Sequence, residues 1–370
     1  MATNPRPTLL LPLLVSTLTA CGGPAAKPPD NRQPHLAESA RQELVAQGVD
    51  QFRGQARILK EESDGATTSV TFDPASGPMC IYGSEYLAHL HTTGSDKALV
   101  FLGGGGACWT GFCKATPIAE TGLLPLAPLH VEVKANPFHG YNVLYLPYCD
   151  GSVFSGDNDV PSPDGERRFH GRRNLAAGLD LLDRLGDLRT IVLGGVSAGG
   201  YGTLFAAAVL RLRYPKADII VYNDSGPWLQ NLAERAAVEA RIKDWRFDRM
   251  IPPSCRDCNG GRGQLISMMD WLLRNDDQLR VGMLCYYRDS TIGDNFTNLP
   301  GDQFKSLLLA ESGKLRAAYP DRVHRYMLDG TAHVLSLYWP DLVKVHGVGV
   351  KEWTAALVAG NGQARDLLGP

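Results

Sequence analysis

A serine at the apex of a glycine-tight turn is the feature that most constrains the fold of this chain. Ser197 lies in the sequence Gly-Val-Ser-Ala-Gly-Gly, directly after the apolar run 190–194 and directly before the alanine-rich stretch 201–213. The first run predicts a buried strand and the second predicts a helix. A strained turn that lifts a hydroxyl out of a sheet needs small residues two positions before and after it, and Gly195 and Gly199 supply them.

This strand, turn and helix form the nucleophile elbow of the α/β-hydrolase fold, which has a mostly parallel central sheet with helices on both faces. The helix that follows Ser197 directs its N-terminal N–H groups to the place where an oxyanion would form. A structural glycine turn and a phosphate-binding loop are the alternatives, but no Gly-x-Gly-x-x-Gly surrounds the serine. We interpret Ser197 as a catalytic nucleophile.

A second glycine cluster lies upstream. The apolar run 97–102 predicts a short buried strand that leads directly into four glycines at 103–106, followed by Ala107. An α/β-hydrolase carries its other oxyanion donor at this place, and glycines let backbone N–H groups approach a ligand closely. The candidate oxyanion donors are the amides of Gly106, Ala107 and Ala198, and an ordinary flexible loop is the alternative.

The general base should be a histidine late in the chain, because this fold orders its triad as serine, acid and histidine. Three of the nine histidines lie far enough downstream, namely His324, His333 and His346. His324 falls inside the strand-like run 323–328, and His346 falls in an expected C-terminal helix. His333 instead lies in the loop after that strand, where the base belongs. A neutral loop histidine is the alternative.

The acid should follow another core strand. The apolar run 281–287 predicts such a strand, and Asp289 lies just past its C-terminal end. A carboxylate there would hold the His333 imidazole in the required tautomer and stabilise its cation. The alternatives for the acid are Asp224, Asp294 and Asp302.

Further motifs accompany these residues in chain order. They are the glycine run ending at Cys108, Pro147-Tyr148-Cys149, Phe154-Ser155-Gly156, Asp224-Ser225-Gly226, and Gly330 three residues before His333. With the serine turn, this set resembles the pectin acetylesterase family, which also contains the animal enzyme that removes a fatty acyl group from Wnt proteins. The resemblance implies a triad of Ser197, Asp289 and His333 and an oxyanion hole of Gly106, Ala107 and Ala198.

The resemblance also implies a function. It predicts a serine carboxylesterase that removes acyl groups, acetyl in particular, from a polysaccharide such as pectin, as a monomer that needs neither metal nor organic cofactor. The family usually has tryptophan where this chain has Ala107, so a substrate contact of that side chain is missing here. A catalytically inactive cell-surface glycan-binding protein is one alternative. A lipase, peptidase or polyester hydrolase on the same scaffold is the second.

The N-terminal segment predicts export. Residues 1–20 have a short apolar core ending in Leu-Thr-Ala before Cys21, which indicates a signal peptide and resembles the cleavage box of bacterial lipoproteins. Cys21 would then carry the lipid that anchors the protein to the cell envelope, and the Pro, Gly and Ala rich stretch 21–36 would be a disordered tether. Ordinary secretion is the alternative. The catalytic domain is expected over 37–370, with a helical cap inserted at about 226–280.

Cysteine spacing supports export. Cys108 and Cys113 are close enough to close a short loop, as are Cys255 and Cys258; the long-range pair of Cys80 with Cys149 remains, which the family resemblance also suggests. Cys285 is left over inside an apolar strand and is expected to be a buried free thiol. Zinc binding at Cys255 and Cys258 is disfavoured because no second ligand pair lies nearby.

Charge and composition add three expectations. The net charge of −2 gives no reason to expect nucleic-acid binding, and the arginine group 167, 168, 172 and 173 is interpreted as a solvated face rather than a contact for an anionic polymer. Runs 56–59, 69–72, 79–82 and 86–91 predict antiparallel strands at the leading edge of the sheet. His89 and His91 are expected on an exposed strand face.

Overall fold

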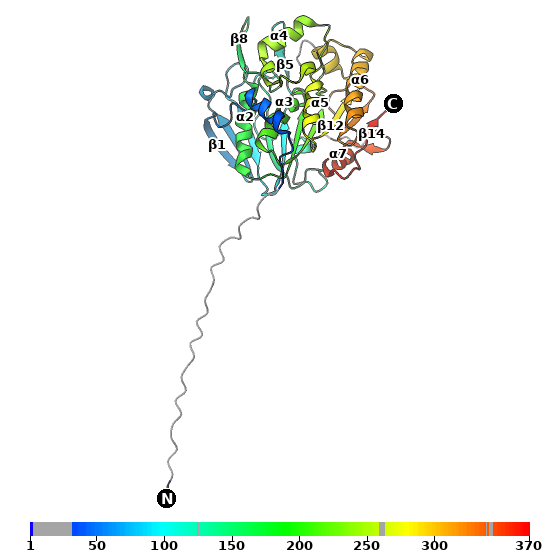
Figure 1. Cartoon of the computed structure of the whole chain (residues 1–370). Coiled ribbons are helices and arrows are strands. Elements are labelled where there is room, and N and C mark those ends of the chain that lie inside the picture. The colour runs from blue at the N-terminus through cyan, green and yellow to red at the C-terminus, as the bar shows by residue number, and fades with distance from the viewer. Residues whose placement is uncertain (3–31, 124–125, 259–262, 338, 340–342) are drawn as a thin grey trace. The chain divides into compact units, whose positions relative to one another are not determined.

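The computed structural model describes residues 1–2, 32–123, 126–258, 263–337, 339 and 343–370 (Figure 1). The chain divides into two compact units, Met1–Arg32 and Gln33–Pro370. The expected signal peptide, Cys21 and most of the tether lie outside the described residues. Within them, no helix has both the length and the apolar character needed to cross a bilayer.

A ten-stranded sheet forms the centre of Gln33–Pro370, in the order β1-β2-β3-β7-β4-β10-β11-β12-β13-β16. Its strands are β1 (Ile58–Asp64), β2 (Thr67–Phe72), β3 (Leu87–His91), β4 (Lys97–Leu102), β7 (Asn142–Leu146), β10 (Thr190–Val196), β11 (Asp218–Asp224), β12 (Arg280–Tyr286), β13 (Val323–Leu328) and β16 (Leu367–Leu368). Strands β1 to β3 are antiparallel, and the strands from β7 to β16 are parallel. The predicted mostly parallel sheet with an antiparallel leading edge is confirmed.

Helices cover both faces of the sheet (Figure 1). They are α1 (Glu38–Ala46), α2 (Gly171–Leu182), α3 (Ala198–Arg213), α4 (Arg235–Trp245), α5 (Ile266–Asn275), α6 (Asp302–Ala318) and α7 (Val350–Ala359). Side chains of β4 alternate between the two cores, because successive residues of a strand point to opposite faces. Val100 joins the core under α1, α2, α3, α5 and α6, whereas Phe101 joins the core under α7 and the segment 126–141.

Two-stranded hairpins extend from this framework. They are β5 (Gly106–Trp109) with β6 (Phe112–Ala115), β8 (Asn158–Ser162) with β9 (Gly165–Phe169), and β14 (Lys344–Val345) with β15 (Val348–Gly349). The β5–β6 hairpin begins at the last residue of the glycine run, so it extends the segment that leaves the end of β4. The expected C-terminal helix at His346 is wrong, because this residue lies in the β14–β15 turn with φ of 49° and α7 begins at Val350.

Two expectations for the leading edge are also wrong. Residues 79–82 form no strand and contribute a single bridge from Met79 to Glu85. His89 and His91 are buried rather than exposed, and His89 Nδ1 lies 2.8 Å from Ser69 Oγ on the neighbouring strand. The Nε2 atom of His89 lies 3.3 Å from the carbonyl oxygen of Glu120, so a later segment covers this face of the strand.

The segment 226–280, which the sequence predicts to cap the site, supplies two different structural parts. Helix α5 packs against α3 and α6 and therefore belongs to the layer over the sheet, whereas α4 contacts β5 and β8. Trp228, Trp245 and Trp271 are all buried. The Trp245 indole N–H donates to the Cys108 carbonyl at 2.7 Å, so this ring holds the β5–β6 hairpin in place.

Candidate active site

Ser197 occupies the expected turn between β10 and α3. Its φ of 55° is in the left-handed region, which strains a residue with a side chain and is typical of a nucleophile elbow. A Cβ atom at Gly195 would collide with the Gly199 carbonyl, and one at Gly199 would collide with the Leu102 carbonyl. The small residues on either side of Ser197 are therefore required by close backbone approach.

The glycine run lies against this turn. A Cβ atom added to Gly104 would lie 3.1 Å from the Ser197 Cβ. Gly106 and Ala107 then line the same cavity as Ser197 and Ala198. The amide of Ala198 is at the first position of α3 and has no acceptor within the helix, which leaves it free for a ligand. The assignment of these amides as oxyanion donors stays a prediction.

His333 and Asp289 meet across the ends of β12 and β13. The His333 Nδ1 atom lies 2.7 Å from Asp289 Oδ2. The carboxylate is fully buried, and its Oδ1 accepts the backbone N–H groups of Thr291 at 3.0 Å and Ile292 at 3.1 Å. These bonds fix the carboxylate and, through it, the orientation of the imidazole. The His333 Nε2 atom is buried and has no hydrogen-bond partner in the described structure, so it is available to a proton donor.

Asp224 serves the site in a way the sequence did not predict. Its carboxylate does not contact His333. Instead, Oδ2 accepts the backbone N–H groups of Leu335 at 2.9 Å and Ser336 at 2.6 Å, just after the histidine. Its own carbonyl accepts the Ser197 N–H at 2.9 Å. Asp224 therefore ties the serine turn to the histidine loop, and its complete burial raises its pKa.

The remaining candidate acids and bases lie away from this pair. Asp302 forms an ion pair with Arg288 at 2.8 Å. Asp294 lies in a π-helix, η6 (Thr291–Thr297), and makes no contact with His333 among the interactions of the described residues. His346 Nε2 lies 2.9 Å from the Leu368 carbonyl. Of the candidate acids and bases, the structure brings Asp289 and His333 together.

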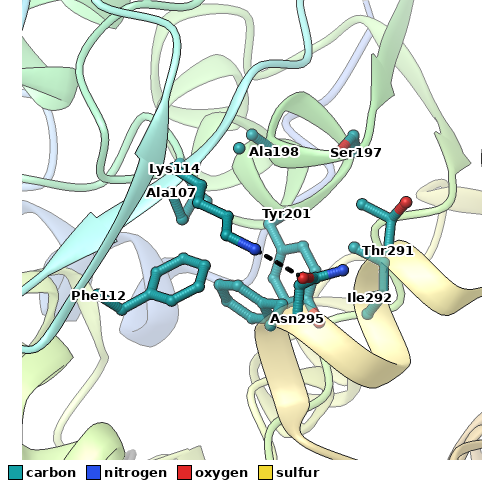
Figure 2. Close-up of a pocket in the computed structure, with 12 residues that line it drawn as sticks. Ala107, Phe112, Lys114, Ser197, Ala198, Tyr201, Thr291, Ile292 and Asn295 are labelled. Atoms are coloured by element: carbon teal, nitrogen blue, oxygen red, sulfur yellow. Dashed lines mark hydrogen bonds between the residues drawn. The ribbon is translucent and has the colours of Figure 1, made fainter. Parts of the chain in front are cut away.

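The cavity beside Ser197 has a volume of about 240 Å³ and is shown in Figure 2. Its apolar wall is formed by Phe112, Val153, Tyr201, Ile292 and Phe296. Its polar lining residues besides Ser197 are Lys114, Thr291 and Asn295. The sequence did not predict these lining residues, because hairpin β5–β6 and helix η6 carry no hydrophobic period.

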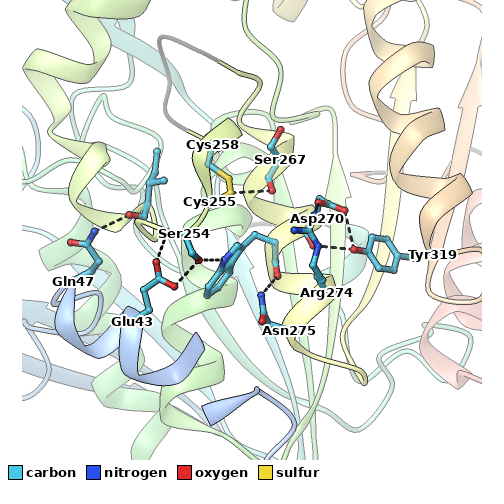
Figure 3. The surroundings of a disulfide bond; sticks show 12 residues. Glu43, Gln47, Ser254, Cys255, Cys258, Ser267, Asp270, Arg274, Asn275 and Tyr319 are labelled. Carbon is cyan, nitrogen blue, oxygen red and sulfur yellow. Dashed lines mark hydrogen bonds and ion pairs between the residues drawn. A yellow bond between two sulfur atoms is a disulfide. The ribbon is translucent and has the colours of Figure 1, made fainter. Parts of the chain in front are cut away.

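All three expected disulfides are formed. They join Cys80 to Cys149, Cys108 to Cys113 and Cys255 to Cys258, and Cys285 is a buried free thiol. Cys255 and Cys258 are joined to each other in the disulfide shown in Figure 3. The Cys108–Cys113 bond closes the β5–β6 hairpin next to the candidate oxyanion donors. Three disulfides indicate a protein that folds in an oxidising compartment outside the cytoplasm.

Comparison with known proteins finds similarity over part of the chain. A sequence model described as pectinacetylesterase matches residues 126–249. Pectin acetylesterase 5 of Arabidopsis thaliana is 32% identical over 170 residues, which cover 41% of this chain and 40% of that protein. Pectin acetylesterase 4 of the same plant is 29% identical over 174 residues, which cover 43% of this chain and 42% of that protein. Over these segments the chain is similar to pectin acetylesterases.

The chain spans less than half of the length of the pectin acetylesterases it matches. The segment recognised as pectinacetylesterase contains Ser197 and Asp224 but ends before Asp289 and His333. It also begins after Ala107. The roles of Ala107, Asp289 and His333 therefore stay predictions.

Proposed function

We propose that this chain is a serine carboxylesterase that removes acetyl groups from a pectic polysaccharide. The observation that carries the proposal is the His333–Asp289 contact of 2.7 Å, which leaves the His333 Nε2 atom unpartnered on a loop that Asp224 ties to the Ser197 turn. The likeness to plant proteins named pectin acetylesterases supports the choice of the ester and the polymer.

The mechanism has two half-reactions. His333 Nε2 takes the proton of the Ser197 hydroxyl while its oxygen attacks the ester carbonyl. The amides of Gly106, Ala107 and Ala198 hold the tetrahedral oxyanion. The carbon–oxygen bond to the sugar breaks, and the sugar oxygen receives the proton from His333. Water then attacks the acyl-enzyme with the same proton transfers and releases acetate.

Asp289 supports both half-reactions from behind the histidine. Its carboxylate faces Nδ1 and keeps the proton there in the neutral ring, so that Nε2 is the acceptor. When Nε2 is protonated, the buried carboxylate at 2.7 Å stabilises the imidazolium. A cavity of about 240 Å³ holds an acetyl group and leaves space for part of the alcohol portion.

The test is hydrolysis of p-nitrophenyl esters from acetate to palmitate by the purified chain. We expect activity to be greatest at acetate and Ser197→Ala to lower kcat by about 10³-fold or more. Ser306→Ala, on the exposed side of α6, is the matched control and should retain full activity. Equal rates near background for wild type and Ser197→Ala would contradict the proposal and favour a glycan-binding protein.

We also propose that the protein is exported, anchored through a lipid on Cys21, and monomeric. The apolar leader and the residues that precede Cys21 support the lipid anchor. Metabolic labelling with a radioactive fatty acid should label the wild type and not Cys21→Ser. Recovery of an unlabelled wild-type protein in the culture medium would instead indicate ordinary secretion. Sedimentation of the purified protein would test the monomer.

A further inference from the structure

A lysine reaches across the active-site cavity. Lys114 projects from β6, and its Nζ atom donates to Asn295 Oδ1 at 3.0 Å on the π-helix η6 (Figure 2). The two side chains therefore meet over the same cavity that contains Ser197. Lys114 is exposed, and it forms no ion pair with a carboxylate in the described part of the chain. Its charge is available to a ligand.

An arginine lies behind the aromatic wall of the cavity. Arg241 is 3% exposed, and its guanidinium lies 4.9 Å from the Trp109 ring centroid and 5.2 Å from that of Phe296. Burial lowers its pKa to about 10, so it is charged at neutral pH. It has no carboxylate partner among the described residues, whereas the equally buried Arg211 pairs with Asp276 at 2.6 Å. A buried cation without a counter-ion makes its surroundings favourable for an anion.

The interpretation of the arginine group 167, 168, 172 and 173 as a solvated face is wrong, because Arg167 and Arg172 are buried. Arg168 pairs with Glu166 at 2.9 Å, and Arg173 pairs with Asp157 at 3.0 Å. Arg167 donates to the Trp109 carbonyl at 3.1 Å. These three side chains make their polar contacts within the protein.

We propose that Lys114 and Asn295 form a carboxylate subsite that binds the uronate carboxyl group of the acetylated sugar. The inference rests on the proposed function, since it concerns the alcohol portion of the same ester. The lysine ammonium has three N–H donors, of which one is used on Asn295. The Asn295 amide nitrogen donates one N–H to the Ser290 carbonyl at 3.3 Å and has a second N–H to offer. A carboxylate between them would receive one hydrogen bond from each side chain.

The subsite would select for charge. Pectin is a polymer of uronate residues, many of which carry a free carboxylate and some of which are methyl-esterified. A free carboxylate would bind Lys114 by a charge-assisted hydrogen bond, whereas a methyl ester would lose the charge and most of that energy. Because Lys114 is exposed, we expect the gain to be at most about fivefold in affinity at low salt and to decrease as salt is added.

The experiment compares two forms of one substrate. Acetylated oligogalacturonate is prepared with free carboxyl groups and with the same groups methyl-esterified, and acetate release is measured for both. Lys114→Gln should raise KM on the free-carboxyl form by about threefold to fivefold, change kcat little, and leave the methyl-esterified form unaffected. Lys114→Arg keeps the charge and should retain most of the preference.

Lys134→Gln is the matched control. Lys134 is exposed and precedes the N-terminal end of β7, whereas the active site lies at the C-terminal ends of the parallel strands. This variant should behave as wild type on both substrates. An equal effect of Lys114→Gln on both substrates, or no effect on either, would overturn the carboxylate subsite while leaving the esterase proposal intact.

A wild-type protein that releases no acetate would refute the proposed function. In that case a binding measurement tests the carboxylate subsite independently. Calorimetric titration with oligogalacturonate that carries no acetyl groups requires no catalysis. Binding that is weakened by Lys114→Gln and restored by Lys114→Arg supports the subsite. An absence of binding, or binding that is equal in wild type and Lys114→Gln, overturns it.

Discussion

The buried carboxyl of Asp150 should make the stability of this protein depend on pH. Asp150 follows Cys149 of the long-range disulfide and is completely buried. Its Oδ1 accepts the backbone N–H of Ser152 at 2.8 Å and also the Ser152 hydroxyl, while its Oδ2 has no partner in the described structure. The turn that follows places Val153 in the wall of the active-site cavity. Burial outweighs these hydrogen bonds and raises the pKa of Asp150 to about 6.

The sign follows from proton linkage. The native state holds the Asp150 proton more tightly than the unfolded chain, in which the pKa is 3.8. The stability due to the neutral carboxyl is therefore fully present below the unfolded pKa and is lost as the pH rises through the folded pKa. At 1.36 kcal/mol for each pKa unit, the free energy of unfolding should fall by about 2 kcal/mol between about pH 4 and about pH 7 from this group alone.

The variant that tests this prediction is Asp150→Asn, which cannot ionise. Its amide oxygen can accept both bonds from Ser152, while its amide nitrogen is left without an acceptor and lowers stability by a similar amount at every pH. The difference in unfolding free energy between Asp150→Asn and wild type should therefore shift by about 2 kcal/mol in favour of the variant from about pH 4 to about pH 7.

Urea unfolding with the disulfides intact measures this shift, because the free energy in water follows from linear extrapolation. The exposed Asp64→Asn serves as the control for a general effect of removing one carboxylate. A difference between Asp150→Asn and wild type that stays the same across this pH range would refute the argument. It would mean that Asp150 is ionised in the native protein throughout that range, or that water reaches its unpartnered oxygen.

Three further predictions follow from the site and its supports. Asp224→Ala should lower kcat for p-nitrophenyl acetate by about 10-fold to 100-fold with little change in KM, because the loop of His333 loses its hydrogen-bond acceptor. Asp224→Asn should retain more activity, since its one amide oxygen can accept both N–H groups. Ile292→Trp should fill part of the cavity and lower the rate with butyrate more than the rate with acetate, as a comparison of kcat/KM for the two esters would show. Replacing both Cys80 and Cys149 with alanine should lower the free energy of unfolding by about 2 to 5 kcal/mol in urea titrations.

The local sequence pattern was sufficient to predict the central strands of the fold. The expected strands 97–102 and 323–328 match β4 and β13 residue for residue, because each is a short strand-like run between clear breaks. The turn at Ser197 could also be predicted from the sequence, since close backbone approach requires glycine on both sides of Ser197. Asp289 and His333 could be paired in advance because both follow core strands, and the carboxyl ends of parallel strands meet at one edge.

Contacts made by irregular segments could not be predicted in the same way. His89 is buried because the segment around Glu120 passes over it, and nothing in the alternation of β3 shows that this face is covered. Arg241 lies on a helix of low amphipathicity, where a charged residue is normally solvated, but the indole of Trp109 and the ring of Phe296 enclose it. In each case the residue that makes the contact is distant in sequence and lies in a segment without a hydrophobic period.

The order of the strands explains why Asp224 links the parts of the site. Strand β11 lies between β10, which ends at the serine turn, and β12, which precedes Asp289, and β13 follows with the loop of His333. A residue at the end of β11 is therefore adjacent to the Ser197 turn on one side. On the other side it can reach past Asp289 to the His333 loop. Asp224 uses its carbonyl for Ser197 and its carboxylate for the N–H groups after His333. A buried carboxylate that does not touch the imidazole thus sets the separation between the Ser197 turn and the His333 loop.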